Sequence, residues 1–201
     1  MSIIVEHEKR RYEILEKALE AFMDEGFEDV TFQKIADRCG ITRTTLYAYF
    51  RNKREIFNFS IKQFLQILEN DISDIRKKTD ISQTEKLIEV MLVVIERLEE
   101  NRPILSVILD YLVNNFKEGF DPDDRVRRRT VRLRHILATM LIEGIKKGEF
   151  NKDIDLKDAN EMLYTFFESA IYRLAILRRS GVGELKDAMK QAVQGFRANQ
   201  D

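Results

Sequence analysis

The sequence is poor in residues that break helices or cross-link loops. Among 201 residues there are two prolines, eight glycines and one cysteine. A single cysteine excludes an intramolecular disulfide, and no Cys/His spacing typical of a metal site is present. So few prolines and glycines, in a chain rich in leucine, isoleucine, glutamate, lysine and arginine, favour helices throughout. We therefore predict an all-α protein of about nine helices.

Long apolar runs are missing as well. The sequence has no stretch of about 18 uninterrupted apolar residues, as a membrane-spanning helix would require. Charged residues interrupt the apolar start of the chain, which is unlike a secretory leader. We therefore expect a cytoplasmic protein that does not interact with membranes. Hydrophobic residues make up 44% of the chain, enough for the core of one long domain or two small ones.

Motifs for catalysis are also lacking. His7 and His135 are the only histidines, and no His–Glu pair has the spacing of a metal site. The sequence contains neither a glycine-rich phosphate loop nor the serine motif of a hydrolase. We therefore predict that the protein is not an enzyme and has no cofactor or metal.

The most informative part of the chain is residues 30–53, VTFQKIADRCGITRTTLYAYFRNK. Thr31 and Thr42 are suitable N-caps for two short helices, because a threonine hydroxyl can accept a backbone N–H. Gly40 lies between them, where the chain needs a left-handed residue and glycine adopts positive φ without steric cost. Two short helices joined by a tight turn predict a helix-turn-helix that docks on duplex DNA.

Positive charge is concentrated here, although the whole chain has a formal net charge of −1. Residues 38–54 include five basic residues and no acidic one. Lys34 and Arg43 lie in the first turns of the two helices, where the helix dipole favours acidic side chains. Cations beside these positive helix ends are unfavourable unless an external anion binds there. We therefore expect these cations to be free of internal carboxylates and to face DNA phosphates.

The same stretch resembles the N-terminal domain of the tetracycline-repressor (TetR) family of regulators, over about residues 8–58. The resemblance implies a three-helix DNA-binding head, residues 1–52, and a helical body, residues 53–201, that binds a ligand and dimerises. Many members have histidine where this chain has Tyr49, but a tyrosine hydroxyl can still donate to phosphate. By position, the resemblance implies DNA contacts from Thr31, Gln33, Arg43, Thr44, Thr45, Tyr47, Tyr49 and Lys53.

The resemblance also implies a homodimeric transcriptional repressor that a small molecule releases from its operator. A two-fold dimer would present its recognition helices to successive major grooves about 34–36 Å apart, so we expect a near-palindromic operator on double-stranded DNA. The alternative is a helical protein-interaction adaptor that has kept an unused helix-turn-helix.

Further helices are predicted over residues 6–25, 53–77, 83–100, 104–116, about 121–147, 156–179 and 184–198. The helix over 53–77 would span about 37 Å, long enough to reach from the DNA into the body. The last two helices carry more apolar surface than one core contact requires, which favours a four-helix contact with a second copy. The predicted dimer contacts are Leu163, Phe166, Phe167, Ala170, Leu174, Leu185, Met189 and Phe196. The alternative is that one chain buries them within its own body.

Aromatic, flexible or polar residues on otherwise apolar helices are candidates for lining a ligand pocket in the body. They are Phe64, Met91, Tyr111, Asn115, Thr139, Tyr164 and Glu168. Glu168 is the preferred polar anchor, because a buried carboxylate needs a partner. The alternative for each residue is an ordinary core or surface position. The aromatic and methionine residues in this set favour a hydrophobic or aromatic effector.

Overall fold

The computed structural model describes residues 2–117 and 123–198, with side chains for residues 5–114 and 131–198. Over these ranges the chain forms nine α-helices, one π-helical turn and an isolated β-bridge between Phe150 and Arg197, which confirms the all-α prediction. The elements are α1 Ser2–Glu25, α2 Phe32–Cys39, α3 Arg43–Tyr49, α4 Lys53–Lys77, α5 Gln83–Glu100, α6 Arg102–Lys117, α7 Asp123–Lys146, α8 Leu156–Ile171, η1 Tyr172–Ile176 and α9 Gly183–Gln194.

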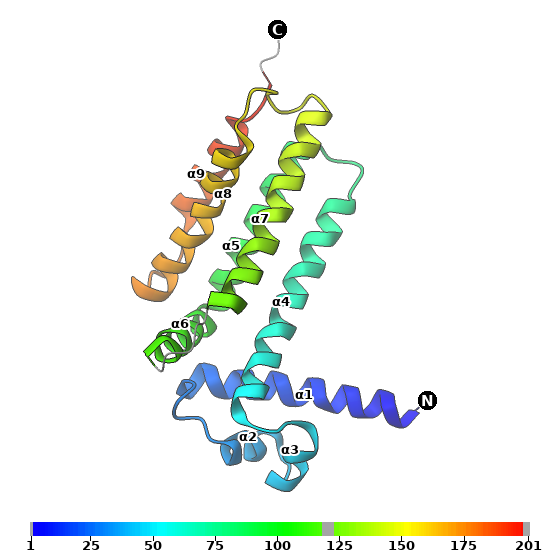
Figure 1. Ribbon diagram of the computed structural model, residues 1–201, viewed down its shortest axis with the longest axis vertical. Coiled ribbons are helices and arrows are strands. Elements are labelled where there is room, and N and C mark those ends of the chain that lie inside the picture. The colour runs from blue at the N-terminus through cyan, green and yellow to red at the C-terminus, as the bar shows by residue number, and fades with distance from the viewer. Residues whose placement is uncertain (1, 118–122, 199–201) are drawn as a thin grey trace.

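The head is held together by α1, which lies across the foot of α4 with α2 and α3 below it (Figure 1). Its apolar residues recur three or four positions apart, so one side of α1 is buried. Phe22 of α1, Ile35 of α2 and Leu46 of α3 are fully buried in one apolar cluster, here called the head cluster.

The two short helices begin and end as predicted. The Thr31 hydroxyl accepts the backbone N–H of Lys34 at 3.2 Å, and the Thr42 hydroxyl accepts that of Thr45 at 3.0 Å. Gly40 ends α2 with φ 65° and ψ 34°, in the left-handed region. Local hydrogen bonds and one glycine therefore set the angle between α2 and α3.

Helix α4 connects the head to the body. The Asn52 side chain accepts the N–H of Glu55 at 2.8 Å and starts the helix. Ile56 and Phe57 of α4 belong to the head cluster, whereas Ile72 belongs to a second apolar cluster, here called the body cluster. The head cluster therefore continues past residue 52. The domain boundary at that residue stays a prediction.

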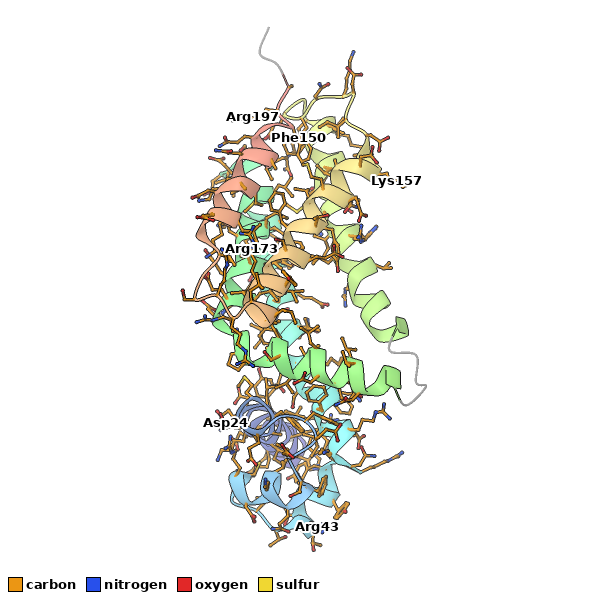
Figure 2. The ribbon with its side chains drawn as sticks, turned by 90° about the vertical axis from the view of Figure 1, so that its left-hand side faces the viewer. Asp24, Arg43, Phe150, Lys157, Arg173 and Arg197 are labelled. Carbon is orange, nitrogen blue, oxygen red and sulfur yellow. The ribbon has the colours of Figure 1, made fainter. Side chains whose placement is uncertain are left out.

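The body is built around α5, which contacts α4, α7, α8 and α9. Leu87, Met91 and Ile95 on α5 are fully buried in the body cluster. Figure 2 shows Arg43 near one end of the long molecule and Phe150 and Arg197 near the other. Helix α3 and the far end of the body are thus separated along the length of α4.

Three helix ends differ from the sequence prediction by three residues or more. Helix α1 begins at Ser2, four residues earlier than expected. Helix α8 continues into the π-helical turn η1, where the Leu177 N–H donates to the Tyr172 carbonyl five residues back. The helical segment ends before Arg178, which has a φ of 50°. Helix α9 stops at Gln194 because the following residues turn to pair with the segment after α7, with the Asn151 N–H donating to the Phe196 carbonyl at 2.9 Å.

The expectation that the predicted dimer contacts form spare apolar surface is corrected for six of the eight residues. These six are buried in the body cluster of their own chain: Leu163, Phe167, Ala170, Leu174, Leu185 and Met189. Phe166 and Phe196 pack against that cluster and are partly buried. For these six residues the structure agrees with the alternative interpretation, in which one chain buries them within its own body. The physical reason is that α8 and α9 pack on α5 through this face.

Within the described ranges, no helix is long and apolar enough to span a membrane. No group of three or more His, Cys, Asp or Glu side chains among the described residues is placed to hold a metal ion.

Candidate nucleic-acid interface

The outer face of α3 carries the exposed polar residues of the helix-turn-helix. Leu46 faces inward and is fully buried, which leaves Arg43, Thr44 and Tyr47 exposed to solvent. Arg43 Nη2 donates to the Tyr47 hydroxyl at 3.2 Å, and its guanidinium lies 5.6 Å from the centre of the Tyr47 ring. Arg43 forms no ion pair with any described carboxylate. Its remaining donors face solvent, where a base edge or a phosphate can accept them.

The other predicted contacts flank this face. Thr45 is exposed, and its hydroxyl lies 2.8 Å from that of Thr42. Gln33 is exposed on α2 and donates to Asp37 Oδ1 at 2.7 Å. Tyr49, at the end of α3, is half-buried because its ring stacks on His7 with centroids 4.5 Å apart. Thr45, Gln33 and Tyr49 stay predictions for DNA contact.

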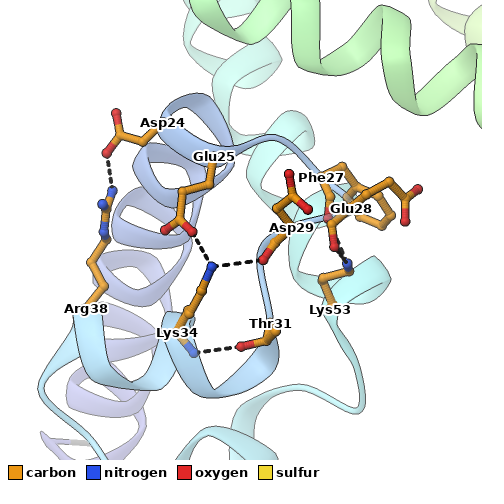
Figure 3. Close-up of polar contacts among 9 residues, drawn as sticks. All are labelled: Asp24, Glu25, Phe27, Glu28, Asp29, Thr31, Lys34, Arg38 and Lys53. Atoms are coloured by element: carbon orange, nitrogen blue, oxygen red, sulfur yellow. Dashed lines mark hydrogen bonds and ion pairs between the residues drawn. The ribbon is translucent and has the colours of Figure 1, made fainter.

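The expectation that the cations near these helix ends have no internal partner is wrong on the α2 side. Lys34 Nζ lies 2.5 Å from Glu25 Oε2, and Arg38 Nη1 lies 2.7 Å from Asp24 Oδ2; Figure 3 shows both pairs. The hydrogen bond that Arg38 donates to Asp24 raises the pKa of Arg38. Asp24 and Glu25 end α1, which packs against α2. Carboxylates of the head itself therefore neutralise the two α2 cations.

Lys53 is also engaged inside the head. Its Nζ donates to the backbone carbonyls of Phe27 at 2.7 Å and of Glu28 at 3.1 Å, and lies 4.5 Å from the centre of the Phe27 ring (Figure 3). Burial lowers the pKa of Lys53. An ammonium has three donors, so one is left for a phosphate. Thr31 is similar, since its oxygen caps α2 and its hydroxyl hydrogen can still donate.

The side chain of Arg54 connects α4 to α6. Its Nε donates to the Tyr111 hydroxyl of α6 at 2.9 Å. The Tyr111 ring lies 4.7 Å from both the Phe27 ring and the Phe57 ring, between centroids. Arg54 was counted with the cations expected to face DNA, but its side chain contacts Tyr111, a residue of the head cluster. Of the five basic residues counted from the sequence, Arg43 and Arg51 are those whose side chains form no hydrogen bond or ion pair with a described residue outside α3.

The candidate pocket residues lie in two different clusters. Met91 is fully buried in the body cluster, whereas Tyr111 belongs to the head cluster and Phe64 packs against it. Tyr164 is partly buried, with the Arg134 guanidinium 4.0 Å from its ring centre. The structure therefore does not bring Tyr111 and Met91 into one apolar cluster.

The polar members of that set behave differently from expectation. Glu168 is exposed on α8, so the reason for choosing it as a buried anchor is wrong. The Thr139 hydroxyl donates to the carbonyl of His135, one turn earlier on α7, at 2.8 Å. Asn115 lies outside the residues whose side chains the structure describes.

Sequence reasoning missed the contacts that side chains of α1 make with the helix-turn-helix and the start of α4. Asp24 and Glu25 were not considered as partners for the α2 cations, although both directly precede Gly26 at the end of the first helix. His7 and Arg11 contact the rings of Tyr49 and Phe59, respectively. Their spacing of four residues on a helix was the available signal.

A helix-turn-helix whose second helix exposes arginine and tyrosine, joined by one long helix to a helical body, defines a DNA-binding regulator. Residues 14–58 match the family model described as bacterial regulatory proteins, tetR family. The fatty acid metabolism regulator protein of Bacillus subtilis is 25% identical over 175 residues, which cover 79% of this chain and 80% of that protein. The transcriptional repressor KstR2 of Mycolicibacterium smegmatis is 26% identical, over 81% of this chain and 76% of that protein.

Solved structures have the same fold. A TetR transcription regulator from Haloarcula marismortui superposes with a TM-score of 0.78 at 22% identity, over 94% of this chain and 97% of that one. The ketosteroid transcriptional regulator KstR2 of Mycobacterium tuberculosis superposes with a TM-score of 0.64 at 23% identity, over 94% and 96%. Residues 14–58 thus resemble the DNA-binding domain of the tetR family, and the chain is a DNA-binding transcriptional regulator.

Proposed function

We propose that the protein is a homodimeric repressor that binds a near-palindromic operator and leaves it when a small hydrophobic ligand binds the body. The outer face of α3 carries this proposal. Arg43, Thr44 and Tyr47 are exposed there, and Arg43 is free of carboxylates within the described ranges. Arginine is suited to guanine edges in the major groove, and hydroxyls are suited to phosphates.

Footprinting on the DNA upstream of the coding sequence tests DNA binding and would define the operator. Tyr47→Ala should abolish operator binding while the protein stays folded. Tyr12→Ala is the matched control, since Tyr12 is 44% exposed on α1 and Tyr47 is 50% exposed on α3. Undiminished affinity of Tyr47→Ala in a mobility-shift titration would contradict the contact. A wild-type chain that binds no duplex at low salt would favour the adaptor alternative.

The dimer proposal rests on the outer side of α8 and η1. Met162, Tyr172 and Ile176 are 40%, 53% and 57% exposed and lie within one side of the helix. Ala188 on the neighbouring α9 and Gly195 directly after it are exposed, and such small residues let a second helix approach closely. Regulators of this family act as dimers, and this outer side replaces the buried face that the sequence suggested.

A charged substitution on this surface tests the dimer. Ile176→Glu should produce a monomer in analytical ultracentrifugation and weaken operator binding, because burying an unpaired carboxylate in an interface is costly. Val131→Glu is the control, since Val131 is 58% exposed on α7. A dimer that survives Ile176→Glu would place the contact elsewhere.

The ligand proposal rests on the apolar body cluster and on the relatives. Met91 is fully buried there, and Tyr164 packs against the same cluster. The relatives are named for fatty acid metabolism and for ketosteroids, so we propose a lipid-like effector. Fatty acids and sterols should raise the melting temperature and release the operator, whereas no shift with any of these compounds would contradict a lipid-like effector.

Helix α6 is the proposed route from the body to the head. It contacts η1 at one side and α1 at the other, and its Tyr111 accepts a hydrogen bond from Arg54. A ligand can act only through different affinities for the DNA-bound and free arrangements of these helices. A shift of α6 would move α1 and change the distance between the two α3 helices of a dimer.

A further inference from the structure

His7 and Arg11 lie on one face of α1 beside the end of α3. They are four residues apart, so their side chains are neighbours on the helix. The His7 ring stacks on the Tyr49 ring, with centroids 4.5 Å apart and planes inclined by 20°. The Arg11 guanidinium lies 4.4 Å from the ring centre of Phe59 and 5.3 Å from that of Phe50. Ring contacts therefore hold both side chains against the end of α3 and the start of α4.

Arg11, like Arg43, has no carboxylate partner among the described side chains, whereas several other cations of the head are paired. Arg10, its neighbour, is paired with Glu13 at 3.0 Å, and Lys34 and Arg38 have partners on α1. Among the described side chains, none forms an ion pair or hydrogen bond with Arg11. Contact with the face of a ring leaves the N–H donors at the edge of the guanidinium available to another acceptor.

We infer that His7 and Arg11 extend the DNA interface from α3 onto α1, where they contact phosphates beside the groove that α3 enters. The inference rests on the proposed operator binding through α3, because Tyr49 is both the stacking partner of His7 and a predicted phosphate contact. A guanidinium forms two parallel hydrogen bonds with a phosphate, and an imidazole N–H forms one. Such contacts fix the position of the protein on the duplex and do not depend on base sequence.

Salt dependence of duplex binding tests Arg11. For the full chain, the logarithm of the association constant is plotted against the logarithm of salt concentration, for an operator duplex and for a random duplex. Arg11→Gln should reduce the slope by about 0.9 per protomer, the value for one lost phosphate contact, and weaken both duplexes by a similar factor. Arg38→Gln is the control with the same change in formal charge. Its slope should equal that of the wild type, because Asp24 already neutralises Arg38.

A second variant separates a lost contact from a damaged fold. Arg11→Lys keeps the positive charge, so it should restore the wild-type slope even if the ring contact is weaker. A slope that is unchanged in Arg11→Gln, or that Arg11→Lys fails to restore, would overturn the assignment of Arg11.

His7 is tested by a pair of variants. His7→Phe keeps a ring for stacking on Tyr49 but removes the N–H donor, whereas His7→Ala removes both. If His7 donates to phosphate, both variants should weaken the operator and random duplexes, and wild-type affinity of His7→Phe would overturn its contact. These experiments separate a failure of the proposed operator binding from a failure of the proposed α1 contacts. A wild type without salt-dependent DNA binding refutes operator binding itself, whereas a binding wild type with insensitive α1 variants refutes the extension alone.

Discussion

The α2 side and the α3 side of the head both carry cations near helix ends, but their surroundings differ. On the α2 side, Lys34 and Arg38 are paired with Glu25 and Asp24, which α1 supplies. On the α3 side, Arg43 contacts a neutral hydroxyl. A count of basic residues therefore overestimates the surface available to DNA. What matters for phosphate binding is which cations the fold leaves without a carboxylate.

The largest predicted difference between the two sides is the loss of operator affinity when an arginine is removed from each. Arg43→Ala should weaken operator binding by about 10- to 100-fold, corresponding to about 1–3 kcal/mol for a specific arginine contact. Arg38→Ala should change operator affinity less than about threefold, because the lost charge was already paired and a surface pair contributes about 1 kcal/mol or less. Fluorescence anisotropy with the footprinted operator measures both. Equal losses for the two variants would abolish the distinction.

The turn that joins the two sides has the next largest predicted effect. Gly40→Ala should destabilise the protein by about 1–2 kcal/mol, because an alanine at φ 65° brings its Cβ close to the carbonyl oxygen. An added Cβ meets no atom within 4 Å, so the cost is that of the backbone conformation alone. Urea unfolding measures the change.

Gly183→Ala is the control for that substitution. An added Cβ at Gly183 also meets nothing within 4 Å, and its φ is not positive. Alanine should therefore be neutral or slightly stabilising at Gly183, at the start of α9. Equal destabilisation by both variants would show that positive φ is not the cause.

Local features of the head could be predicted from the sequence. Thr31, Gly40 and Thr42 act within four residues of their own positions, so residue type and spacing were sufficient. The ion pairs of the α2 side could not be obtained in this way. Lys34 reaches back nine residues and Arg38 reaches back fourteen. Those contacts exist because of how α1 packs on α2, which no pattern within one helix specifies.

The predicted face of α8 was wrong for a related reason. A helix with apolar residues on most of its circumference offers two faces that could be buried. Sequence composition does not show which face the chain's own core covers. In the structure Leu163 and Phe167 are buried against α5, whereas Met162 and Ile176 are exposed. The prediction of the ligand pocket failed at Glu168 for the same reason, because this residue lies on the exposed side of α8.

The two N-caps provide a smaller, matched test. Thr31→Ala and Thr42→Ala should each destabilise the protein by about 1 kcal/mol in urea unfolding, because each leaves a backbone N–H without its acceptor. Their effects on DNA should differ. Thr42 also holds the Thr45 hydroxyl at 2.8 Å, so its loss should weaken operator binding more than the loss of Thr31. A larger effect of Thr31→Ala on DNA would move the interface toward α2.

The smallest effect on stability is expected from removing the carboxylates that pair with the α2 cations. Asp24→Asn combined with Glu25→Gln should change the free energy of unfolding by less than about 1 kcal/mol, because both pairs lie at the surface. Its effect on DNA binding has the opposite sign to that of Arg43→Ala. Lys34 and Arg38 would then add their charge to the positive potential of the head, so duplex binding should become a few-fold tighter at low salt.

The range of electrostatic interactions decides how that gain depends on salt. The Debye length is about 30 Å at 0.01 M salt and about 8 Å at 0.15 M, so charges outside the contact surface act on DNA mainly at low salt. The gain should therefore disappear at physiological salt if the α2 cations lie beyond direct reach of phosphate. A gain that persists at high salt would mean that both sides of the head contact DNA, and that Asp24 and Glu25 restrain the binding of the α2 side.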